Sequence, residues 1–338
     1  MKILFHCSLP FSLAHGGQAV QIQRTMAALA EIGVDVEPLR WWDEKQEGDL
    51  IHYVGIMPVD QINFARQKKI KVVHANILTG QGSQTPWQRG ARRVFRWGVE
   101  HFAPRIMAQA FGWESYRIAD ACIANTGWEK YLFHYKFGVR PGKIFVVPNG
   151  VEDVFFQTPP VPRNEWLVCT ATITERKRVL ELAGAAVIAQ TPLQVLGRAY
   201  SEDDPYAKRF FSIAEKNPRY IKYAGGISDR AELARIYRSA RGFVLLSTME
   251  TRSLSAEEAA ASGCPLFLSD LPWARSTFGE HARYCPVNVD AAKTAGALKI
   301  FHAEAPALPP PPPPATWQQV ARQLQTIYQD VIAGRVVD

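Results

Sequence analysis

The chain has 338 residues, of which 47% are hydrophobic and 21% are charged, as expected for a globular protein long enough to form two domains. It has no apolar run close to the roughly 20 residues that span a bilayer, and its opening MKILFHCSLPF is too short and too interrupted for a signal peptide. Its five cysteines are scattered and form no CxxC pair, which is typical of a reducing compartment, so we expect a cytoplasmic protein. The formal net charge of +7 indicates an anionic partner, for which nucleic acid, anionic lipid and nucleotide phosphates all qualify.

The first half of the chain alternates apolar runs typical of strands with periodic segments typical of helices. The expected strands and their connections are residues 2–8, 34–41, 49–55, 71–77, 119–125 and 143–150, and the expected helices are residues 18–33, 58–68 and 126–138. The last of these helices begins with a capping box formed by Thr126 and Glu129 and ends at Gly138.

A second round of the same alternation begins at residue 165. Its expected strands are residues 165–171, 193–197, 219–225, 242–247 and 264–269. Such alternation indicates parallel sheets with helices on both faces, and two rounds predict two Rossmann-like domains. We assign residues 1–155 to the first domain and residues 156–338 to the second.

The C-terminal region carries a proline run followed by an amphipathic helix. Six consecutive prolines, residues 309–314, exclude a helix or an interior strand and predict a stiff spacer. The helix expected at 316–333, within the second domain, has Thr316 as its N-cap. Its apolar stripe, which must pack against another surface of the chain, comprises Val320, Leu324, Ile327 and Val331.

The segment METRSLSAEEAAASGCP, residues 249–265, places acidic residues where a strand gives way to a helix. The helix is expected to begin at Ser255, and Ser255 with Glu258 fits a capping box, so Glu258 could simply be a cap. However, open parallel sheets bind ligands at the carboxyl ends of their strands, and free N–H groups at a helix start can hold a phosphate. Glu250 and Glu258 could each accept hydrogen bonds from a vicinal diol beside that phosphate, a combination that describes a nucleotide sugar.

The spacing of Glu250 and Glu258, followed by AAASGCP, resembles the donor-site motif of glycosyltransferase family 4. Residues 15–33, 119–152, the longer stretch 225–265 around this motif, and residues 278–286 are similar to that family in the same order. The resemblance implies the GT-B fold, in which an N-terminal acceptor domain and a C-terminal donor domain face each other across a cleft. It also implies retaining transfer of a sugar from a UDP- or GDP-linked donor to a hydroxyl group of a glycan or lipid-linked glycan.

The resemblance also implies roles for residues of the donor domain. Glu258 would hold the ribose diol, and Glu250 would contact hydroxyls of the donor sugar and support charge at the anomeric centre. The backbone of Ser253 and Leu254 would face the diphosphate. Lys177 would neutralise the leaving phosphates without a metal ion, although it could also be a solvated lysine at a helix start.

Three further positions are carried over with an alternative left open for each. Gly17 would let the backbone approach the donor closely, or it forms a plain turn. Ile227 would lie against the base, or it belongs to the core. His74 is the residue nearest to the family's active-site histidine, and a structural role is equally open.

The chain departs from the family at one phosphate-binding position. Ala171 and Thr172 stand where a Gly-Arg pair is usual, so one arginine is missing. The candidates to replace it are Arg176, Arg178 and Arg252.

Residues 87–107 mix arginines with aromatic residues and predict either a basic helix on an anionic membrane or a core helix with a solvated face. The arginines are Arg89, Arg92, Arg93, Arg96 and Arg105. We expect peripheral membrane contact at the inner face of the membrane as one use of this segment, and no nucleic-acid partner.

Two alternatives to a transferase remain open: a non-catalytic GT-B partner protein and a sugar-nucleotide epimerase of the same fold. A nicotinamide dehydrogenase is excluded because no G-x-G-x-x-G follows a strand. The five cysteines are dispersed, and no CxxC, DxD or H-x-x-x-H pattern predicts a metal or cofactor site.

Overall fold

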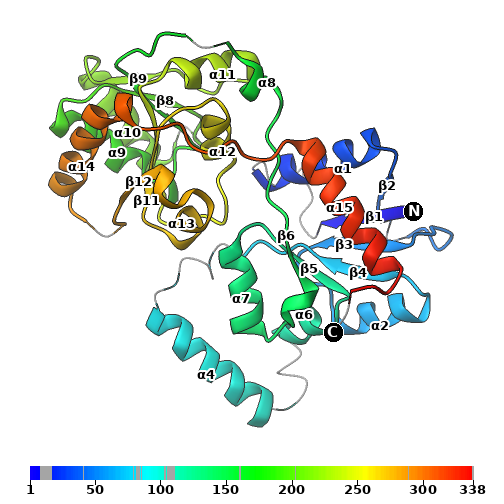
Figure 1. The fold of residues 1–338 in the computed structure, drawn as a ribbon. Coiled ribbons are helices and arrows are strands. Elements are labelled where there is room, and N and C mark those ends of the chain that lie inside the picture. The colour runs from blue at the N-terminus through cyan, green and yellow to red at the C-terminus, as the bar shows by residue number, and fades with distance from the viewer. Residues whose placement is uncertain are drawn as a thin grey trace. The chain divides into compact units, whose positions relative to one another are not determined.

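The computed structural model describes residues 1–336 except 8–16, 41, 79, 81–83, 85, 103, 105–110, 160, 202 and 288. The chain forms two compact units: unit 1 comprises Met1–Gly150 and Ala315–Asp338, and unit 2 comprises Val151–Pro314. Each unit holds a six-stranded parallel sheet flanked by helices (Figure 1), which confirms the prediction of two Rossmann-like domains.

The sheet of unit 1 has the strand order β2-β1-β3-β4-β5-β6. Its strands are β1 (Lys2–Cys7), β2 (Asp35–Pro38), β3 (Leu50–Val54), β4 (Lys71–His74), β5 (Ala121–Ala124) and β6 (Ile144–Val146). Residues 50–54 and 121–124 are buried without interruption, as is usual for parallel strands that are covered on both faces.

The helices of unit 1 connect these strands. They are α1 (Gly17–Glu31), α2 (Val59–Gln67), α4 (Pro86–Phe102), α6 (Trp113–Ile118), α7 (Gly127–Phe137) and the C-terminal α15 (Trp317–Ile332), with a short 3-10 helix at Pro141–Lys143. Half of the capping box predicted for α7 is present, since the N-cap Thr126 accepts through Oγ1 from the Glu129 N–H at 3.1 Å. The Glu129 carboxylate reaches back to the N–H of Asn125, at 2.7 Å.

The C-terminal helix belongs to unit 1, which corrects its assignment to the second domain. Thr316 caps α15 as predicted, and the four residues of the apolar stripe are buried. They pack with residues of α1 and the first sheet, such as Ile22 and Leu29, and Figure 1 shows α15 beside α1. The apolar stripe predicts that one face of the helix is buried, but not which surface covers it. From the sequence alone, the helix is therefore assigned to the domain that precedes it in the chain.

The sheet of unit 2 has the strand order β12-β11-β10-β7-β8-β9. Its strands are β7 (Leu167–Thr170), β8 (Leu193–Leu196), β9 (Ile221–Tyr223), β10 (Gly242–Leu245), β11 (Leu266–Ser269) and β12 (Ala282–Cys285). The chain runs outward from β7 to β9, then returns to the other side of β7 and continues to β12. The order therefore reverses between β7 and β10, the place where open parallel sheets bind ligands.

The helices of unit 2 cover both faces of this sheet. They are α8 (Val154–Gln157), α9 (Val179–Ala189), α10 (Pro205–Lys216), α11 (Arg230–Ser239), α12 (Leu254–Ala261), α13 (Pro272–Phe278) and α14 (Ala291–Glu304), with 3-10 helices at Glu175–Lys177, Gly279–His281 and Ala305–Ala307. The proline run at 309–314 forms neither helix nor strand, as predicted.

Replacing Leu324 by alanine tests the placement of α15. Leu324 is 2% exposed in the core of unit 1, so its truncation should destabilise that unit by about 2–5 kcal/mol. Hydrogen-exchange mass spectrometry should show faster exchange in peptides from β1, β3 and α1 and unchanged exchange in residues 151–314. The exposed Gln329→Ala on the same helix is the control, and faster exchange mainly in unit 2 would contradict the assignment.

Candidate functional site

The loops that follow β7 and β10 lie against each other at the strand-order reversal of unit 2. The Thr248 N–H donates to the Arg176 carbonyl oxygen at 2.9 Å, and Arg176 Nη1 donates to the Met249 carbonyl oxygen at the same distance. These bonds join the 3-10 helix at Glu175–Lys177 to the segment that leads into α12. Side chains of both loops therefore converge at one edge of the sheet.

The loop after β7 is also fixed by a close approach of the neighbouring strand end. Gly197 follows β8 with φ of +145°, and a Cβ atom there would lie 1.9 Å from the Ala171 carbonyl oxygen. Only glycine permits this approach. The segment from Ala171 to Lys177 thus has a defined path beside the ends of β7 and β8.

Helix α12 begins earlier than the sequence predicts. Ser253 is the N-cap, and its hydroxyl accepts from the Ala256 N–H at 3.3 Å, so the capping box predicted for Ser255 and Glu258 does not form. The Glu257 N–H is bonded to the Ser253 carbonyl oxygen, whereas helix geometry gives the N–H groups of Leu254 and Ser255 no intrahelical acceptor. These two N–H groups, with the helix dipole, provide a place for an anion.

Glu250 lies in the loop before this helix start and is 8% exposed. Its Oε1 atom forms an ion pair with Lys177 Nζ and accepts from Arg176 Nη1 at 3.1 Å. The structure thus brings together two residues, Glu250 and Lys177, that the sequence assigned to one site. Their environment concentrates positive charge, since two cations face one carboxylate.

Glu258 lies on the second turn of α12, is 9% exposed, and forms an ion pair with Arg230 Nη2. Arg230 Nε also donates to Glu152 Oε1 at 2.9 Å, and its guanidinium lies 4.7 Å from the centre of the Phe155 ring. Burial raises the pKa of Glu258 to about 7, although Arg230 opposes the shift. A carboxyl group balanced between its two forms near neutrality is typical of functional sites.

Arg230 is the residue of this arrangement that the sequence analysis missed. It is the first residue of α11, after the N-cap Asp229, where a basic side chain opposes the helix dipole. A basic residue at this unfavourable position was the one sequence feature that could have indicated a functional role for Arg230. The partner, Glu258, lies 28 residues further along the chain, so no local pattern links the two.

Of the three arginines suggested as replacements for the missing one, only Arg176 faces the site. Arg252 pairs with the fully buried Glu257, donating from Nε to Oε1 at 2.7 Å, and Arg178 Nη1 donates to the Val287 carbonyl oxygen at 2.6 Å. The Arg176 side chain is 42% exposed beside Glu250. It can therefore turn toward an incoming anion with little loss of packing.

The remaining positions carried over from the family lie elsewhere in the two units. Ile227 follows β9, is partly buried and packs against the core of unit 2. Gly17 is the exposed first residue of α1 in unit 1, and its neighbour Gly16 lies outside the described residues. Contact with the donor therefore remains a prediction for both residues, beside a plain turn for Gly17 and a core position for Ile227.

His74 is the last residue of β4 and is fully buried. Within the described part of the chain, neither of its ring nitrogens has a hydrogen-bond partner. The ring contacts Tyr53 and Tyr116, with centroids 5.9 and 5.6 Å away. Burial lowers the pKa of His74 to about 3, so the imidazole is neutral, and any role in catalysis must be that of a neutral hydrogen-bonding group.

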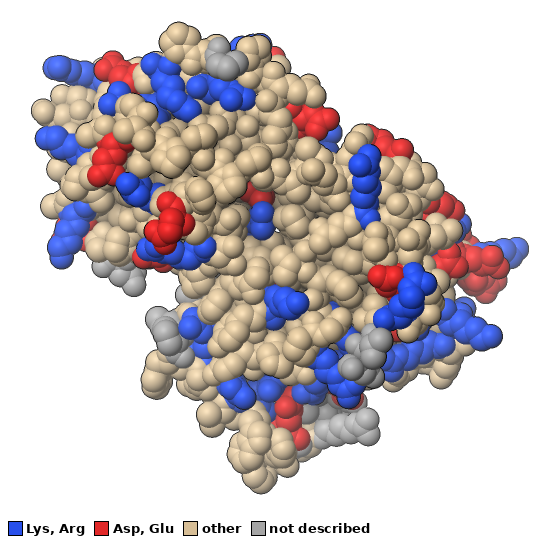
Figure 2. All heavy atoms as spheres, viewed as in Figure 1, with Lys and Arg blue, Asp and Glu red and all other residues tan. Residues whose placement is uncertain are grey.

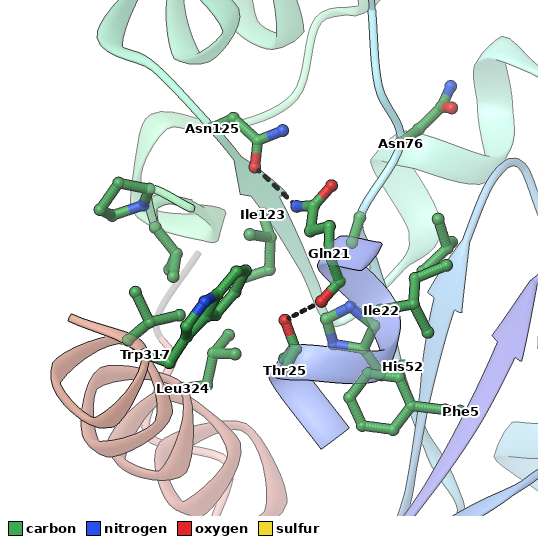
Figure 3. Close-up of a pocket in the computed structure, with 15 residues that line it drawn as sticks. Phe5, Gln21, Ile22, Thr25, His52, Asn76, Ile123, Asn125, Trp317 and Leu324 are labelled. Carbon is green, nitrogen blue, oxygen red and sulfur yellow. Dashed lines mark hydrogen bonds between the residues drawn. The ribbon is translucent and has the colours of Figure 1, made fainter. Parts of the chain in front are cut away.

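A small pocket lies on the same sheet of unit 1, beneath α1 and α15 (Figure 3). Gln21 Nε2 points toward Asn125 Oδ1, at 3.4 Å, and Trp317 closes the pocket from α15. His52 Nδ1 is 2.6 Å from the hydroxyl oxygen of the buried Tyr328. The cavity volume of about 30 Å³ is enough for about one water molecule, so this pocket is too small for a sugar.

Among the described residues, no group of three or more His, Cys, Asp or Glu side chains is arranged to hold a metal ion. No helix in this part of the chain is long and apolar enough to cross a membrane.

Comparison with known proteins gives a family match over part of the chain and a fold match over nearly all of it. Residues 15–154 match the family model described as Glycosyltransferase Family 4. A search of curated proteins found no match.

Among solved structures, sucrose-phosphate synthase from Thermosynechococcus elongatus is similar with a TM-score of 0.69 and 18% identity, over 98% of this chain and 99% of that chain. HepE from Anabaena in complex with UDP is similar with a TM-score of 0.66 and 16% identity, over 98% and 97%. The same protein in complex with UDP-glucose gives 0.63 and 16%, over 99% of each chain. These likenesses, all at 18% identity or less, show that the chain has the two-domain GT-B fold, and the family match shows that residues 15–154 are similar to glycosyltransferase family 4.

Proposed function

We propose that the protein transfers a sugar from a nucleoside diphosphate sugar, UDP- or GDP-linked, to a hydroxyl group of a glycan or lipid-linked glycan acceptor. Transfer proceeds with retention of anomeric configuration and without a metal ion. The observation that carries this proposal is the arrangement around α12, where two buried glutamates flank a free helix start and face Lys177, Arg176 and Arg230. HepE, which has the same fold, binds UDP and UDP-glucose, and this supports the nucleotide-sugar donor.

The diphosphate fits the N–H groups at the start of α12 and the nearby cations. The N–H groups of Leu254 and Ser255 can donate to one phosphate. Lys177 and Arg176, which both contact Glu250 in the loop before this helix, provide two cations for the diphosphate. Cations aimed at a leaving diphosphate stabilise the charge that develops as the glycosidic bond breaks. In this proposal they do the work that a divalent metal ion does in other phosphate chemistry.

The hydroxyl groups of the donor fit the two carboxylates, Glu250 and Glu258. An ionised carboxylate accepts hydrogen bonds only, and its two oxygens can each take one hydroxyl of a diol. Glu258 sits behind the helix start and suits the ribose, whereas Glu250 sits in the loop before it and suits the transferred sugar. A carboxylate near the anomeric carbon also stabilises the positive charge of an oxocarbenium-like transition state.

Lys177→Met and Glu250→Gln test the catalytic assignment. We expect each to lower kcat/KM for sugar transfer by at least about a hundredfold, as loss of a charged transition-state contact does in other enzymes. The exposed Glu232→Gln on α11 is the matched control and should retain full activity. Turnover is measured with UDP-glucose and GDP-mannose, with and without EDTA, and the anomer of the product is read by NMR.

Each outcome of this experiment decides one part of the proposal. An inverted product would contradict retention, and complete loss of activity with EDTA would contradict metal independence. Nucleotide binding without transfer to any acceptor would favour a non-catalytic GT-B partner. Conversion of the donor to an epimeric sugar nucleotide would favour an epimerase.

The helix α4 supports the proposed contact with an anionic membrane. Its apolar residues point to solvent, with Trp87 80% and Phe102 78% exposed. Two of its arginines contact α7: Arg89 and Arg93 lie 4.8 and 4.4 Å from the ring centres of Trp128 and Tyr135. Figure 2 shows Lys and Arg atoms interspersed with uncharged atoms in the region where Figure 1 places α4.

An amphipathic helix with its apolar face outward is stable in contact with a lipid interface, where that face is buried. Arg105 and residues 103, 106 and 107 of the segment assigned to this contact lie outside the described residues. The proposal therefore rests on α4 itself.

The double variant Trp87→Ser/Phe102→Ser tests this contact. We expect at least about tenfold weaker binding to vesicles of phosphatidylcholine and phosphatidylglycerol, because each lost aromatic removes apolar burial in the interface. Cosedimentation at low and high salt is the measurement, and Trp42→Ser, a variant of another highly exposed tryptophan, is the control. Equal binding of the double variant and the parent would contradict the contact.

A further inference from the structure

A second cavity in unit 1, which we call the basic pocket, lies between α4, α6 and α7. Its volume is about 300 Å³, at the lower end of the range for small-molecule sites. Among the described residues, its lining comprises three cations and three aromatic residues: Arg92, Phe95, Arg96, Phe111, Trp113 and Lys136.

Lys136 forms the most enclosed part of this lining. It is 8% exposed, and its Nζ atom donates to the side-chain oxygen of Gln84 at 3.3 Å. Burial, together with the neighbouring Arg92, lowers the pKa of Lys136 to about 8. Among the described residues no carboxylate forms a salt bridge with Lys136 or Arg92, so this part of the pocket holds uncompensated positive charge.

Arg96 adds a guanidinium group that is only partly used. Within the described part of the chain, its Nε and Nη1 atoms are enclosed and have no hydrogen-bond partner. The Glu100 carboxylate lies 3.8 Å from Nε and is bonded to Arg117 at 2.7 Å through its other oxygen. Buried guanidinium nitrogens without acceptors are costly, and the positive charge that Arg96 adds beside the pocket favours an anion there.

The cations of the pocket differ from the other arginines of α4 in what they face. Arg89 and Arg93, which stack on rings of α7, already attach that helix to the unit. Arg92, Arg96 and Lys136 instead surround an open volume. Their repulsion is unfavourable in the free protein and becomes favourable when an anion is present.

The rim of the pocket is aromatic and partly exposed. Phe111 and Trp113 are stacked with ring centroids 4.4 Å apart, and Phe95 meets both rings edge-on at 5.9 and 6.5 Å. Phe95 is 56% exposed, on a helix whose other large apolar side chains also face solvent. A cationic floor with an aromatic rim fits a ligand that has an anionic head and an apolar body.

We propose that the basic pocket binds the phosphoryl group of an amphiphilic molecule, with Arg92, Arg96 and Lys136 on the phosphoryl oxygens and Phe95, Phe111 and Trp113 on the adjoining apolar chain. If the proposed transferase function holds, this amphiphile is the acceptor or the lipid that carries it. Guanidinium groups suit this task because their paired N–H donors match phosphate oxygens.

The variant Lys136→Met tests the pocket in the full-length protein. Titration calorimetry uses hexyl phosphate as the probe and inorganic phosphate as the head group alone. The parent should bind hexyl phosphate more tightly than inorganic phosphate, and Lys136→Met should weaken hexyl phosphate binding by at least about tenfold through loss of a charge-assisted bond. Lys130→Met, on the same helix and outside the pocket lining, should bind as the parent does.

We do not expect a loss of stability in Lys136→Met that could be mistaken for a loss of binding. Methionine keeps the apolar stem of lysine and removes a buried charge, so Lys136→Met should melt at the temperature of the parent or above it. Equal hexyl phosphate binding by Lys136→Met and the parent would overturn the proposal, as would parent binding that is no tighter than for inorganic phosphate. Because no nucleotide is present, the result is independent of the donor site in unit 2.

A second arm distinguishes the two sources of the phosphoryl group. Cosedimentation with mixed vesicles of phosphatidylcholine and phosphatidic acid compares the parent with Lys136→Met. Weaker vesicle binding of the variant supports the pocket with a membrane lipid as its ligand. Unchanged vesicle binding, together with the loss of hexyl phosphate binding, supports the pocket with a soluble phosphorylated acceptor as its ligand.

Discussion

Two glutamate side chains of unit 2 are buried beside the start of α12, and each is held there by cations from other segments of the same unit. Removing a carboxylate from water costs several kcal/mol unless partners replace the lost hydration. Lys177 and Arg176 do so for Glu250, and Arg230 does so for Glu258. The strand-order reversal between β7 and β10 makes the Glu250 pairs possible, because it places the loops after these strands side by side, whereas Arg230 reaches Glu258 from the start of α11, which packs against α12. The free helix start, the acids and the cations thus belong to one arrangement that suits a diphosphate with hydroxyl groups on either side.

The raised pKa of Glu258 shows that this arrangement does not simply maximise stability. A buried carboxyl whose folded pKa lies above its unfolded value loses stability as pH rises through the folded pKa. At neutral pH the fold therefore bears part of the burial penalty, which hydroxyl groups of a ligand would relieve. Active sites are often unfavourable to the free protein in this way.

The sequence predicts the parts of this fold that depend on local pattern. Alternation of strands and helices, the cap at Thr316 and the acids around α12 are all readable along the chain. It does not predict features set by contacts between distant segments, such as the Arg230–Glu258 pair or the packing of α15 on α1. Helix α4 shows the same limit, since periodicity reveals two faces but not that Arg89 and Arg93 contact aromatic rings of α7. The N-cap of α12 at Ser253 was missed because Ser253 and Ser255 are equally good caps.

The most direct test of the donor site is the affinity of UDP-, GDP-, ADP- and dTDP-glucose, measured by calorimetry between about pH 6 and pH 8 for the parent and Glu258→Gln. The phosphates of these donors do not titrate in this range, so the pH dependence reports the protein. With a Glu258 pKa of about 7, the account predicts binding of one donor with affinity that rises about tenfold over this range, as the carboxylate forms. Glu258→Gln should bind that donor weakly and without this pH dependence. Binding of no donor by a folded parent, or equal binding by Glu258→Gln, would contradict the account.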